Sequence, residues 1–518
     1  MGKYLGLDSS TQSLTCCLID HDRHKIEYER SINFDKHFSD DYGTVNGILR
    51  LENGTVHSPP LMWAEALNIL FDTMRGDGVD LSDISSISGS GQQHGTVYLN
   101  HSITKKLANL DPEQILKTQL SCVFSRSTSP IWMDTSTHIQ CTEIETEVGG
   151  KDALLDLTGN TAFERFSAPQ IRKFYQDDPE AYHQTSNISL VSSFIASVLA
   201  GKLIGIDPGD ASGTNLMDIS KRKWSLKALD ATAPDLAKKL LPILNPQTTV
   251  GKISSYFSKR YGFDPRCTIL PFSGDNPCSL IGLGLVESGR VALSLGTSDT
   301  LFACMNAPRV SRNGEGCVFA SPDGRNYMAL ICFLNGSLAR EAVRDNYHFG
   351  WQEFTQALKD TPPGNNGALI LPYFSPEITP KISNPCVIRD SLNESDAKAN
   401  VRAVVEAQAM ASKIHSDWMN VTIRSLYVTG GASTNEEILR IYADIHNCPV
   451  HRFETTNSAA LGGALRALQA DIRCDWKTAV SPFTQPAANS TIEPKPNASE
   501  IYVELLKRYE TLVATHSH

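Results

Sequence analysis

A turn of small residues late in the sequence is the first feature that could bind a ligand. Residues 430–432, Gly-Gly-Ala, follow the short apolar run 425–429 and precede a helical pattern. A glycine turn that leads into the N-terminus of a helix lets a phosphate or a ligand backbone approach closely. Ser433 and Glu436 have the spacing of a capping box, so we expect the helix to begin there.

Asp275 is a second candidate. It lies in the segment 273–277, Ser-Gly-Asp-Asn-Pro, between the apolar run 268–272, which we expect to be a strand, and a predicted helix. An acidic or amide residue before proline is common at helix starts, so the local sequence alone favours a helix cap. Capping and ligand binding are compatible if Asn276 caps the helix while Asp275 points away from it.

Several common catalytic motifs are absent from the sequence. Lys151, Lys202 and Lys252 each follow a glycine, but none is followed by Ser or Thr, so there is no P-loop. The segment 89–94 begins like a dinucleotide-binding motif but has His94 in place of the third glycine. There is also no His-Glu-x-x-His pattern. A P-loop enzyme, a simple dehydrogenase and a zinc protease are therefore disfavoured.

Two similar β-hairpins must position many of the remaining polar residues. Predicted strands 3–7 and 14–20 flank the polar turn 8–12, and we expect this hairpin at the edge of a sheet. The strands 290–295 and 301–305 flank the second turn, 296–300. The two segments look like one motif used twice, which predicts two related domains rather than a solenoid.

Strand and helix patterns alternate along the rest of the chain, which predicts an α/β protein. The predicted elements are a helix over 61–74, a strand over 84–90, a buried helix over 188–199, a strand over 425–429, a Pro-rich loop over 481–499 and a last helix over 500–514.

Length and composition limit the classes of partner. The 518 residues suggest two to four domains. A formal net charge of −10 argues against nucleic acid and anionic membrane surfaces, but not against small anions that bind backbone amides. The 12 cysteines contain no Cys-x-x-Cys pair, which indicates reduced, buried thiols. We find no signal peptide or membrane span and expect a cytoplasmic protein, either a monomer or a homodimer.

Six segments together resemble the FGGY family of carbohydrate kinases, which belongs to the actin-like ATPase fold group. They are GLDSSTQS, SGSGQQHG, WMDTST, FSGDNPCSLIG, SLGTSDTLF and VTGGASTNEEILR, and the similarity extends to about residue 470. The resemblance implies two actin-like ATPase (ribonuclease H-like) domains that face each other across a catalytic cleft. Residues 1–284 would bind the sugar and residues 285–518 the nucleotide.

The implied activity is transfer of the γ-phosphoryl group of ATP to a sugar hydroxyl. Segments such as SGSGQQHGTVY and TAFERF are most similar to the eukaryotic branch of the family that converts D-xylulose to D-xylulose 5-phosphate. Such a reaction needs a positioned hydroxyl, a base, donors for the phosphate oxygens and a metal ion. The implied partners are therefore a small sugar, ATP and Mg²⁺.

The resemblance also implies roles for individual residues. Asp275 would be the general base, and Asp8 would bind Mg²⁺ through water. The residues implied to contact the sugar are His94, Arg165, Asp275, Asn276 and Gln93. Those implied to hold the phosphates are Thr11, Gln12, Gly296, Thr297 and Ser298. Those implied to form the adenosine site are Trp351, Gly430, Gly431, Ala432 and Asn435.

Each of these residues also has a purely structural explanation. Asp8 could be a turn residue that bonds its own backbone, and His94 a buried structural histidine. Arg165 could form a surface ion pair, and Trp351 could be a helical residue that packs in the protein core. Asp134 matches a family motif, and we expect it to support the structure near the sugar.

Ser10 stands where many actin-like ATPases have glycine, which puts the γ-phosphate contacts of the first turn in question.

Other functions remain open at this stage. The nearest alternative is another FGGY sugar kinase that acts on ribulose, glycerol or gluconate. From a different class, the chain could be a filament-forming or chaperone-type actin-like ATPase, which needs no sugar-binding residues. A regulator that binds ligand without catalysis is a third possibility, and the retention of Asp275 argues against it.

Overall fold

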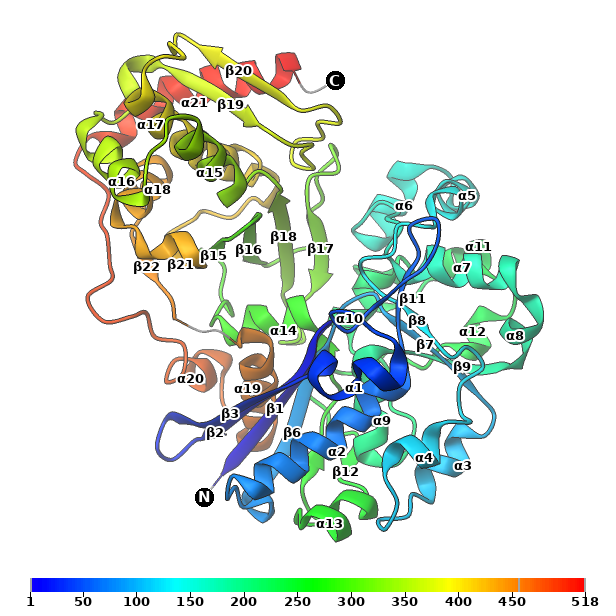
Figure 1. Ribbon diagram of the computed structural model, residues 1–518. Coiled ribbons are helices and arrows are strands. Elements are labelled where there is room, and N and C mark those ends of the chain that lie inside the picture. Colours follow the sequence, from blue (N-terminus) through cyan, green and yellow to red (C-terminus); the bar gives the residue numbers. More distant parts are fainter. Residues whose placement is uncertain (1, 455–456, 517–518) are drawn as a thin grey trace. The chain divides into compact units, whose positions relative to one another are not determined.

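A computed structural model describes residues 2–454 and 457–516 of the 518-residue chain. These residues form two compact units (Figure 1). The first contains the described residues up to 286 together with 319–327 and 457–484, and the second contains the remainder. The assignment of 1–284 and 285–518 to two family domains stays a prediction. Among the described helices, none has the length and apolar character that would be needed to cross a membrane.

The first unit is built on a mixed sheet, and helices alternate with its strands, as expected for an α/β protein. The sheet order is β12 (Gly251–Lys252), β13 (Thr268–Ile269), β6 (Ile84–Gly91), β1 (Lys3–Ser9), β2 (Ser13–Asp20) and β3 (Lys25–Asn33), and β14 (Ser273–Gly274) also pairs with β6. β1 is antiparallel to β2 and parallel to β6.

Two expectations about this sheet need correction. The first hairpin is confirmed, but its place at the sheet edge is wrong, because β3 pairs with β2 along its length. The strand predicted over 268–272 is shorter than expected. Residue pairing with β6 stops at Ile269 and resumes at Ser273, and in between the backbone N–H of Leu270 still donates to β6, to the carbonyl of Ile87 at 3.0 Å.

The second sheet repeats the arrangement of the first hairpin. Its order is β17 (Cys317–Ala320), β18 (Tyr327–Phe333), β16 (Asp299–Met305), β15 (Arg290–Leu295), β21 (Ser425–Thr429) and β22 (Val450–Arg452). β15 is antiparallel to β16 and parallel to β21, as β1 is to β2 and β6. The second predicted hairpin is confirmed, and the shared topology supports one motif used twice.

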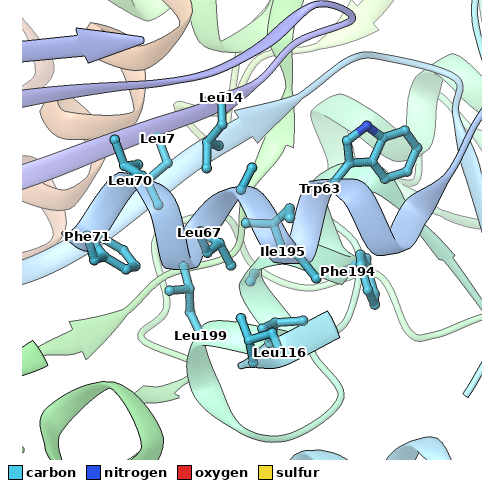
Figure 2. Close-up of a cluster of buried hydrophobic side chains, with 14 of the residues drawn as sticks. Leu7, Leu14, Trp63, Leu67, Leu70, Phe71, Leu116, Phe194, Ile195 and Leu199 are labelled. Carbon is cyan, nitrogen blue, oxygen red and sulfur yellow. The ribbon is translucent and has the colours of Figure 1, made fainter. Parts of the chain in front are cut away.

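α2 (Pro60–Gly76) provides much of the hydrophobic core of the first unit and confirms the helix predicted over 61–74. Its side chains Trp63, Leu67 and Leu70 belong to the same buried cluster as Leu7 and Leu14 from the hairpin (Figure 2). The apolar residues of α9 (Val191–Ala200) complete this cluster. The core thus fixes β1 and β2, which carry the first polar turn, against two helices.

The helix predicted over 188–199 begins later than expected. Residues 188–190 are the end of β9 (Thr185–Leu190), which pairs with β7 (Thr96–Asn100). The Oγ of Ser193 accepts the backbone N–H of Leu190 at 3.0 Å, and α9 begins at Val191. Pairing with a strand about 90 residues earlier decided this boundary, and the local pattern does not contain that information.

The remaining elements agree with the sequence patterns. The helix after the turn 430–432 is α18 (Glu436–His446), and the last helix is α21 (Ala498–His516). Further elements of the first unit are α1 (Phe34–Tyr42), β4 (Leu49–Arg50), β5 (Val56–Ser58), α3 (Ile103–Ala108), α4 (Leu116–Leu120), β8 (Ser129–Pro130), α5 (His138–Val148), α6 (Lys151–Thr158), α7 (Ser167–Asp177), α8 (Pro179–Gln184), α10 (Pro208–Ala211), β10 (Met217–Asp218), β11 (Lys223–Trp224), α11 (Leu226–Thr232), α12 (Leu236–Lys239), α13 (Ser255–Tyr261) and α20 (Trp476–Val480). Those of the second are α15 (Ser337–Asn346), α16 (Trp351–Asp360), β19 (Leu369–Tyr373), β20 (Cys386–Asp390) and α17 (Ala397–Ile414).

Glycines allow two helices of the first unit to touch backbone to backbone. α14 (Asp275–Gly282) packs against α19 (Ser458–Ile472), which also lies on β1 and β6. A Cβ atom on Gly462 would lie 2.0 Å from the carbonyl oxygen of Cys278, and one on Gly282 would lie 1.9 Å from that of Ser458. These distances leave no room for a side chain, so the glycines fix the position of α14 on α19.

We therefore expect Gly462→Ala to destabilise the first unit by about 1–3 kcal/mol, because the new methyl group would overpack the α14 contact. Alanine is the better helix former by about 1 kcal/mol, so the loss has to exceed that gain. Calorimetry of the full chain would measure it as a lower unfolding midpoint. Gly76→Ala at the end of α2 is the matched control, since its Cβ would meet nothing within 4 Å. A Gly462→Ala midpoint equal to that of this control would contradict the prediction.

Candidate functional site

Asp275 is the first residue of α14 and lies at the end of the parallel strands. β14 pairs with the last residues of β6, Ser273 with Ser90 and Gly274 with Gly91, and α14 starts directly afterwards. The helix N-cap is Gly274, so neither Asp275 nor Asn276 occupies the cap position. The Asp-Asn sequence before Pro277 is nevertheless typical of a helix cap. Asp275 makes a bond of that kind within the helix, since its Oδ1 accepts the backbone N–H of Asn276 at 2.8 Å.

A second carboxylate, Asp8, lies close enough to affect Asp275 electrostatically. Asp8 is in β1 opposite Ser90 of β6, not in the turn, so the explanation of Asp8 as a turn residue is wrong. Its side chain is buried and accepts hydrogen bonds from the hydroxyls of Ser10 and of Ser90, the latter at 2.7 Å. Burial raises the pKa of Asp8. Burial, followed by the Asp8 charge, raises the pKa of Asp275 to about 7.

Amide side chains surround the Asp275 carboxylate. The backbone N–H of Gln93 donates to Asp275 Oδ1 at 3.3 Å, and the Asn276 side-chain amide donates to the same oxygen at 3.1 Å. Asn276 also donates to Gln93 Oε1 at 3.2 Å, and Gln93 donates to the carbonyl of Gly209 at 3.3 Å. The structure therefore joins three of the predicted sugar-side residues in one hydrogen-bonded group.

His94 follows the end of β6 and is held in one orientation. Its backbone has a positive φ of 76°, and its ring stacks on Phe166 at a centroid distance of 4.3 Å. Nδ1 lies 2.6 Å from the carbonyl oxygen of Gly213, which can only accept, so Nδ1 carries the proton and Nε2 is an acceptor. Burial, and then the charge of Arg165, lowers the pKa of His94 to about 3, so the ring is neutral near pH 7.

Arg165 lies over aromatic rings in the segment that precedes α7. Its guanidinium carbon is 4.9 Å from the ring centroid of Phe163 and 5.7 Å from that of Phe166. Such contacts orient a guanidinium while its N–H donors stay directed outward. Since Phe166 also stacks on His94, the two predicted sugar-binding residues share one aromatic support.

Asp134 supports this segment from behind. It is fully buried, and Oδ1 accepts from the Gln170 amide at 2.8 Å while Oδ2 accepts from the Val56 backbone N–H at 2.9 Å. Gln170 in turn donates to the carbonyl of Glu164, the residue before Arg165, at 2.9 Å. The expectation of a supporting role is consistent with these contacts.

The first polar turn lies beside the same group of residues. Thr11 donates to Gln92 Oε1 at 3.3 Å and accepts the indole N–H of Trp132 at 2.8 Å. The side chain of Gln12 is exposed, and its backbone carbonyl accepts from Phe34. Among the described residues Ser10 does not belong to those with positive φ, so this turn does not require glycine at that position.

A buried ion pair beneath these residues was not predicted from the sequence. Asp207 accepts from Arg466 Nη2 at 2.7 Å, from Ser273 Oγ at 2.7 Å and from the Gly209 N–H at 2.8 Å. Both charged side chains are almost fully buried. In the sequence Asp207 before Pro208 indicates only a helix cap, which it also is, and Arg466 is 259 residues away. No local signal pairs them.

Six of the ten predicted nucleotide residues line a cavity of about 630 Å³ in the second unit: Gly296, Thr297, Trp351, Gly431, Ala432 and Asn435. Gly430 and Ser298 do not line it, and Thr11 and Gln12 belong to the first unit. Gly430 has a φ of 87°, and a Cβ there would lie 2.5 Å from the carbonyl oxygen of Leu295. A residue without a side chain is therefore required where the chain runs close to the end of β15. Arg340 also lines the cavity and was missed by the sequence patterns.

Two details of this cavity differ from expectation. Asn435, not Ser433, is the N-cap of α18, because its Oδ1 accepts from the N–H groups of Glu437 and Ile438 while residues 431–434 form a short 3₁₀ turn. Trp351 is 46% exposed at the start of α16, with the Arg344 guanidinium 4.4 Å from its ring, so its explanation as a core residue is wrong.

Comparisons with known protein families and curated proteins give a consistent result. Residues 128–282 match the N-terminal domain, and residues 291–470 the C-terminal domain, of the FGGY family of carbohydrate kinases. The chain is 42% identical over 520 residues to xylulose kinase from Rattus norvegicus, covering 98% of this chain and 96% of the relative. It is 41% identical over 485 residues to xylulose kinase 2 from Arabidopsis thaliana, with 90% and 86% covered.

Solved structures agree on the fold. A xylulose kinase from Rhodospirillum rubrum gives a TM-score of 0.83 at 17% identity, covering 99% of this chain and 98% of the other. A gluconate kinase from Lactobacillus acidophilus gives 0.81 at 19% identity, with 100% and 98% covered. At these identities the likeness shows the fold alone and does not distinguish between sugars.

The coupling between the two carboxylates can be tested directly. Asp8→Asn removes a negative charge near Asp275, so we expect the pKa of Asp275 to fall from about 7 towards the usual range. Carbon-13 NMR of carboxyl-labelled aspartate would measure the titration. Asp264→Asn, a partly exposed position of the same unit that pairs with Arg266, is the control and should leave the titration unchanged. An unchanged pKa in Asp8→Asn would contradict the proposed coupling.

Proposed function

The chain belongs to the FGGY family of carbohydrate kinases, and from this premise we propose that it transfers the γ-phosphoryl group of ATP to D-xylulose, forming D-xylulose 5-phosphate. The choice of sugar is supported by the curated xylulose kinases that are 41–42% identical over nearly the whole chain. The observation that carries the chemistry is Asp275, a carboxylate with a pKa of about 7 within a group of hydrogen-bonding amides.

Asp275 is proposed as the general base. A base is most effective when its pKa lies near the working pH, and burial beside Asp8 brings Asp275 there. The donors from Gln93 and Asn276 reach Oδ1, so we assign the proton of the sugar hydroxyl to Oδ2. Transfer of that proton makes the hydroxyl oxygen a better nucleophile for the γ-phosphorus of ATP.

His94 and Arg165 are proposed to orient the sugar. The Nε2 of neutral His94 can accept a hydrogen bond from a donor such as a sugar hydroxyl group. Arg165 offers several N–H donors to hydroxyl or carbonyl oxygens of the sugar. With Gln93 and Asn276, these residues provide both donors and acceptors, which a polyhydroxylated substrate requires.

The cavity of the second unit is proposed to bind the nucleotide. Gly431 and Ala432 leave space for close approach, and Trp351 offers an apolar ring to the base. Asn435 is already used as a helix cap and donates to Thr355 Oγ1 at 2.9 Å, so we assign it to shaping the cavity. Turn 296–298 of the second unit is proposed to bind phosphate oxygens through backbone N–H groups. The same role is proposed separately for Thr11 and Gln12 in the turn of the first unit.

Mg²⁺ fits the carboxylates of the first unit. The described residues contain no group of three or more His, Cys, Asp or Glu side chains arranged for a metal ion. Mg²⁺ itself needs only one or two carboxylates together with substrate phosphates and water. Burial is the main cause of the raised pKa of Asp275, and a cation held by Asp8 would relieve the smaller contribution that the Asp8 charge makes. Bound there, Mg²⁺ would neutralise developing negative charge on the phosphates.

The sugar assignment predicts the outcome of a substrate panel with Mg-ATP. ADP release should be fastest with D-xylulose and much slower with ribulose, glycerol and gluconate, because a site that hydrogen-bonds one set of hydroxyls leaves its polar groups unpaired when another sugar binds. Highest kcat/KM with another sugar would overturn the choice of D-xylulose. ATP hydrolysis that no sugar stimulates would favour an actin-like ATPase without sugar kinase activity.

The role of Asp275 predicts both a mutant effect and a pH profile. Asp275→Asn should lower kcat by about 10²-fold or more, because the amide cannot accept the proton. In the unmodified protein the base must be ionised, so kcat/KM should fall by about tenfold per pH unit below about pH 7. Asp264→Asn is again the control and should leave both unchanged. Near-normal turnover of Asp275→Asn would show that this carboxylate is not the base.

A further inference from the structure

Arg340 forms a buried ion pair at the wall of the second-unit cavity. It lies on α15 and is 1% exposed, and its guanidinium meets the carboxylate of Asp299 in two parallel contacts, Nη1 to Oδ2 at 3.0 Å and Nη2 to Oδ1 at 3.1 Å. Nη1 also donates to Gln408 Oε1 at 2.8 Å. The guanidinium is therefore fixed by partners from β16 and α17.

The turn 296–298 is built around this ion pair. The carbonyl of Gly296 accepts from the Ser337 N–H at 2.8 Å and from Arg340 Nη2 at 3.4 Å. Asp299 directly follows the turn, and a Cβ on Gly336 would lie 2.7 Å from the carbonyl oxygen of Thr297. The turn thus rests on the N-terminal end of α15 without space for rearrangement on that side.

Gln408 of α17 connects Arg340 to the residues that precede α15. Its amide nitrogen donates to the carbonyls of Asn335 and Gly336, each at 2.8 Å, while its oxygen accepts from Arg340. Hydrogen bonds therefore connect the turn 296–298, the ion pair and the residues before α15 into one rigid group.

A buried ion pair is a costly way to stabilise a fold, since apolar residues of similar size often do as well. Its two parallel hydrogen bonds do, however, impose a fixed geometry. We propose that Arg340 is a positioning residue: paired with Asp299, it holds the turn 296–298 in the shape that receives the nucleotide phosphates, without bonding the phosphates itself. The proposal rests on the nucleotide site proposed above. Both terminal nitrogens of Arg340 are already bonded to Asp299, Gln408 and Gly296, which favours support over direct contact.

Arg340→Lys tests the proposal, because lysine keeps the charge but cannot form the two parallel bonds. Binding of ADP and of adenosine would be measured by titration calorimetry, and kcat with D-xylulose and Mg-ATP. We expect ADP affinity to fall by about tenfold, adenosine affinity to stay the same, and kcat to fall by about 10²-fold through misplacement of the phosphates. The control is Arg402→Lys, which breaks a second buried pair of the same unit, with Glu406. It should lower the melting temperature without changing the ratio of ADP to adenosine affinity.

Asp299→Asn is the second variant, and it also serves if Arg340→Lys does not fold. A positioning role predicts the same selective loss of ADP affinity, because the turn loses its anchor. Direct contact of Arg340 with phosphate predicts that ADP affinity is kept or increased, and that result would overturn the proposal. Equal losses for ADP and adenosine, or no loss, would also overturn it. If the unmodified protein bound neither ADP nor adenosine, the proposed nucleotide site would fail as well, which separates the two cases.

Discussion

The buried ion pair between Asp207 and Arg466 is the interaction on which the site of the first unit depends. Two charges removed from water destabilise a protein unless their hydrogen-bonding capacity is filled. Here the carboxylate of Asp207 accepts hydrogen bonds from Ser273 and Gly209 as well as from Arg466. Ser273 lies two residues before Asp275, so the pair connects the start of α14 to α19. The glycine contacts between these helices then fix their separation.

Burial shifts the neighbouring ionisable groups in opposite directions, and both shifts suit the proposed chemistry. It disfavours the charged form of any group, so the pKa of Asp275 rises while that of His94 falls. A carboxylate that can take a proton near pH 7 thus lies in the same unit as a neutral imidazole that can only accept from a hydroxyl. A surface site would provide neither, since solvent would return both groups to their ordinary values.

The two hairpins use one topology with different electrostatics. In each unit the first strand of the hairpin is antiparallel to its partner and parallel to a third strand. In the first, the buried carboxylate Asp8 precedes the turn and accepts hydrogen bonds from two hydroxyls. In the second, Asp299 follows the turn and is neutralised by Arg340. The same backbone motif therefore carries a hydroxyl-bonded carboxylate in one unit and an ion-paired carboxylate in the other.

The sequence by itself determined the local features: both hairpins, the helices α2 and α18, and the glycine turn at 430–432. Hydrophobic periodicity and turn-forming residues carry that information, because these features depend only on residues that are close in the sequence. It also contained the motifs that indicated Asp275, His94 and Arg165. It misplaced the cap of α18 and the start of α9, where a side chain or a distant strand chose between close alternatives. Only the tertiary structure decided that Asp207 meets Arg466, that Arg340 meets Asp299, and that Asp275 titrates near neutrality. The two ion pairs join residues 41 and 259 positions apart, and the pKa of Asp275 depends on burial and on the distant Asp8. No local pattern encodes burial or such distant partners.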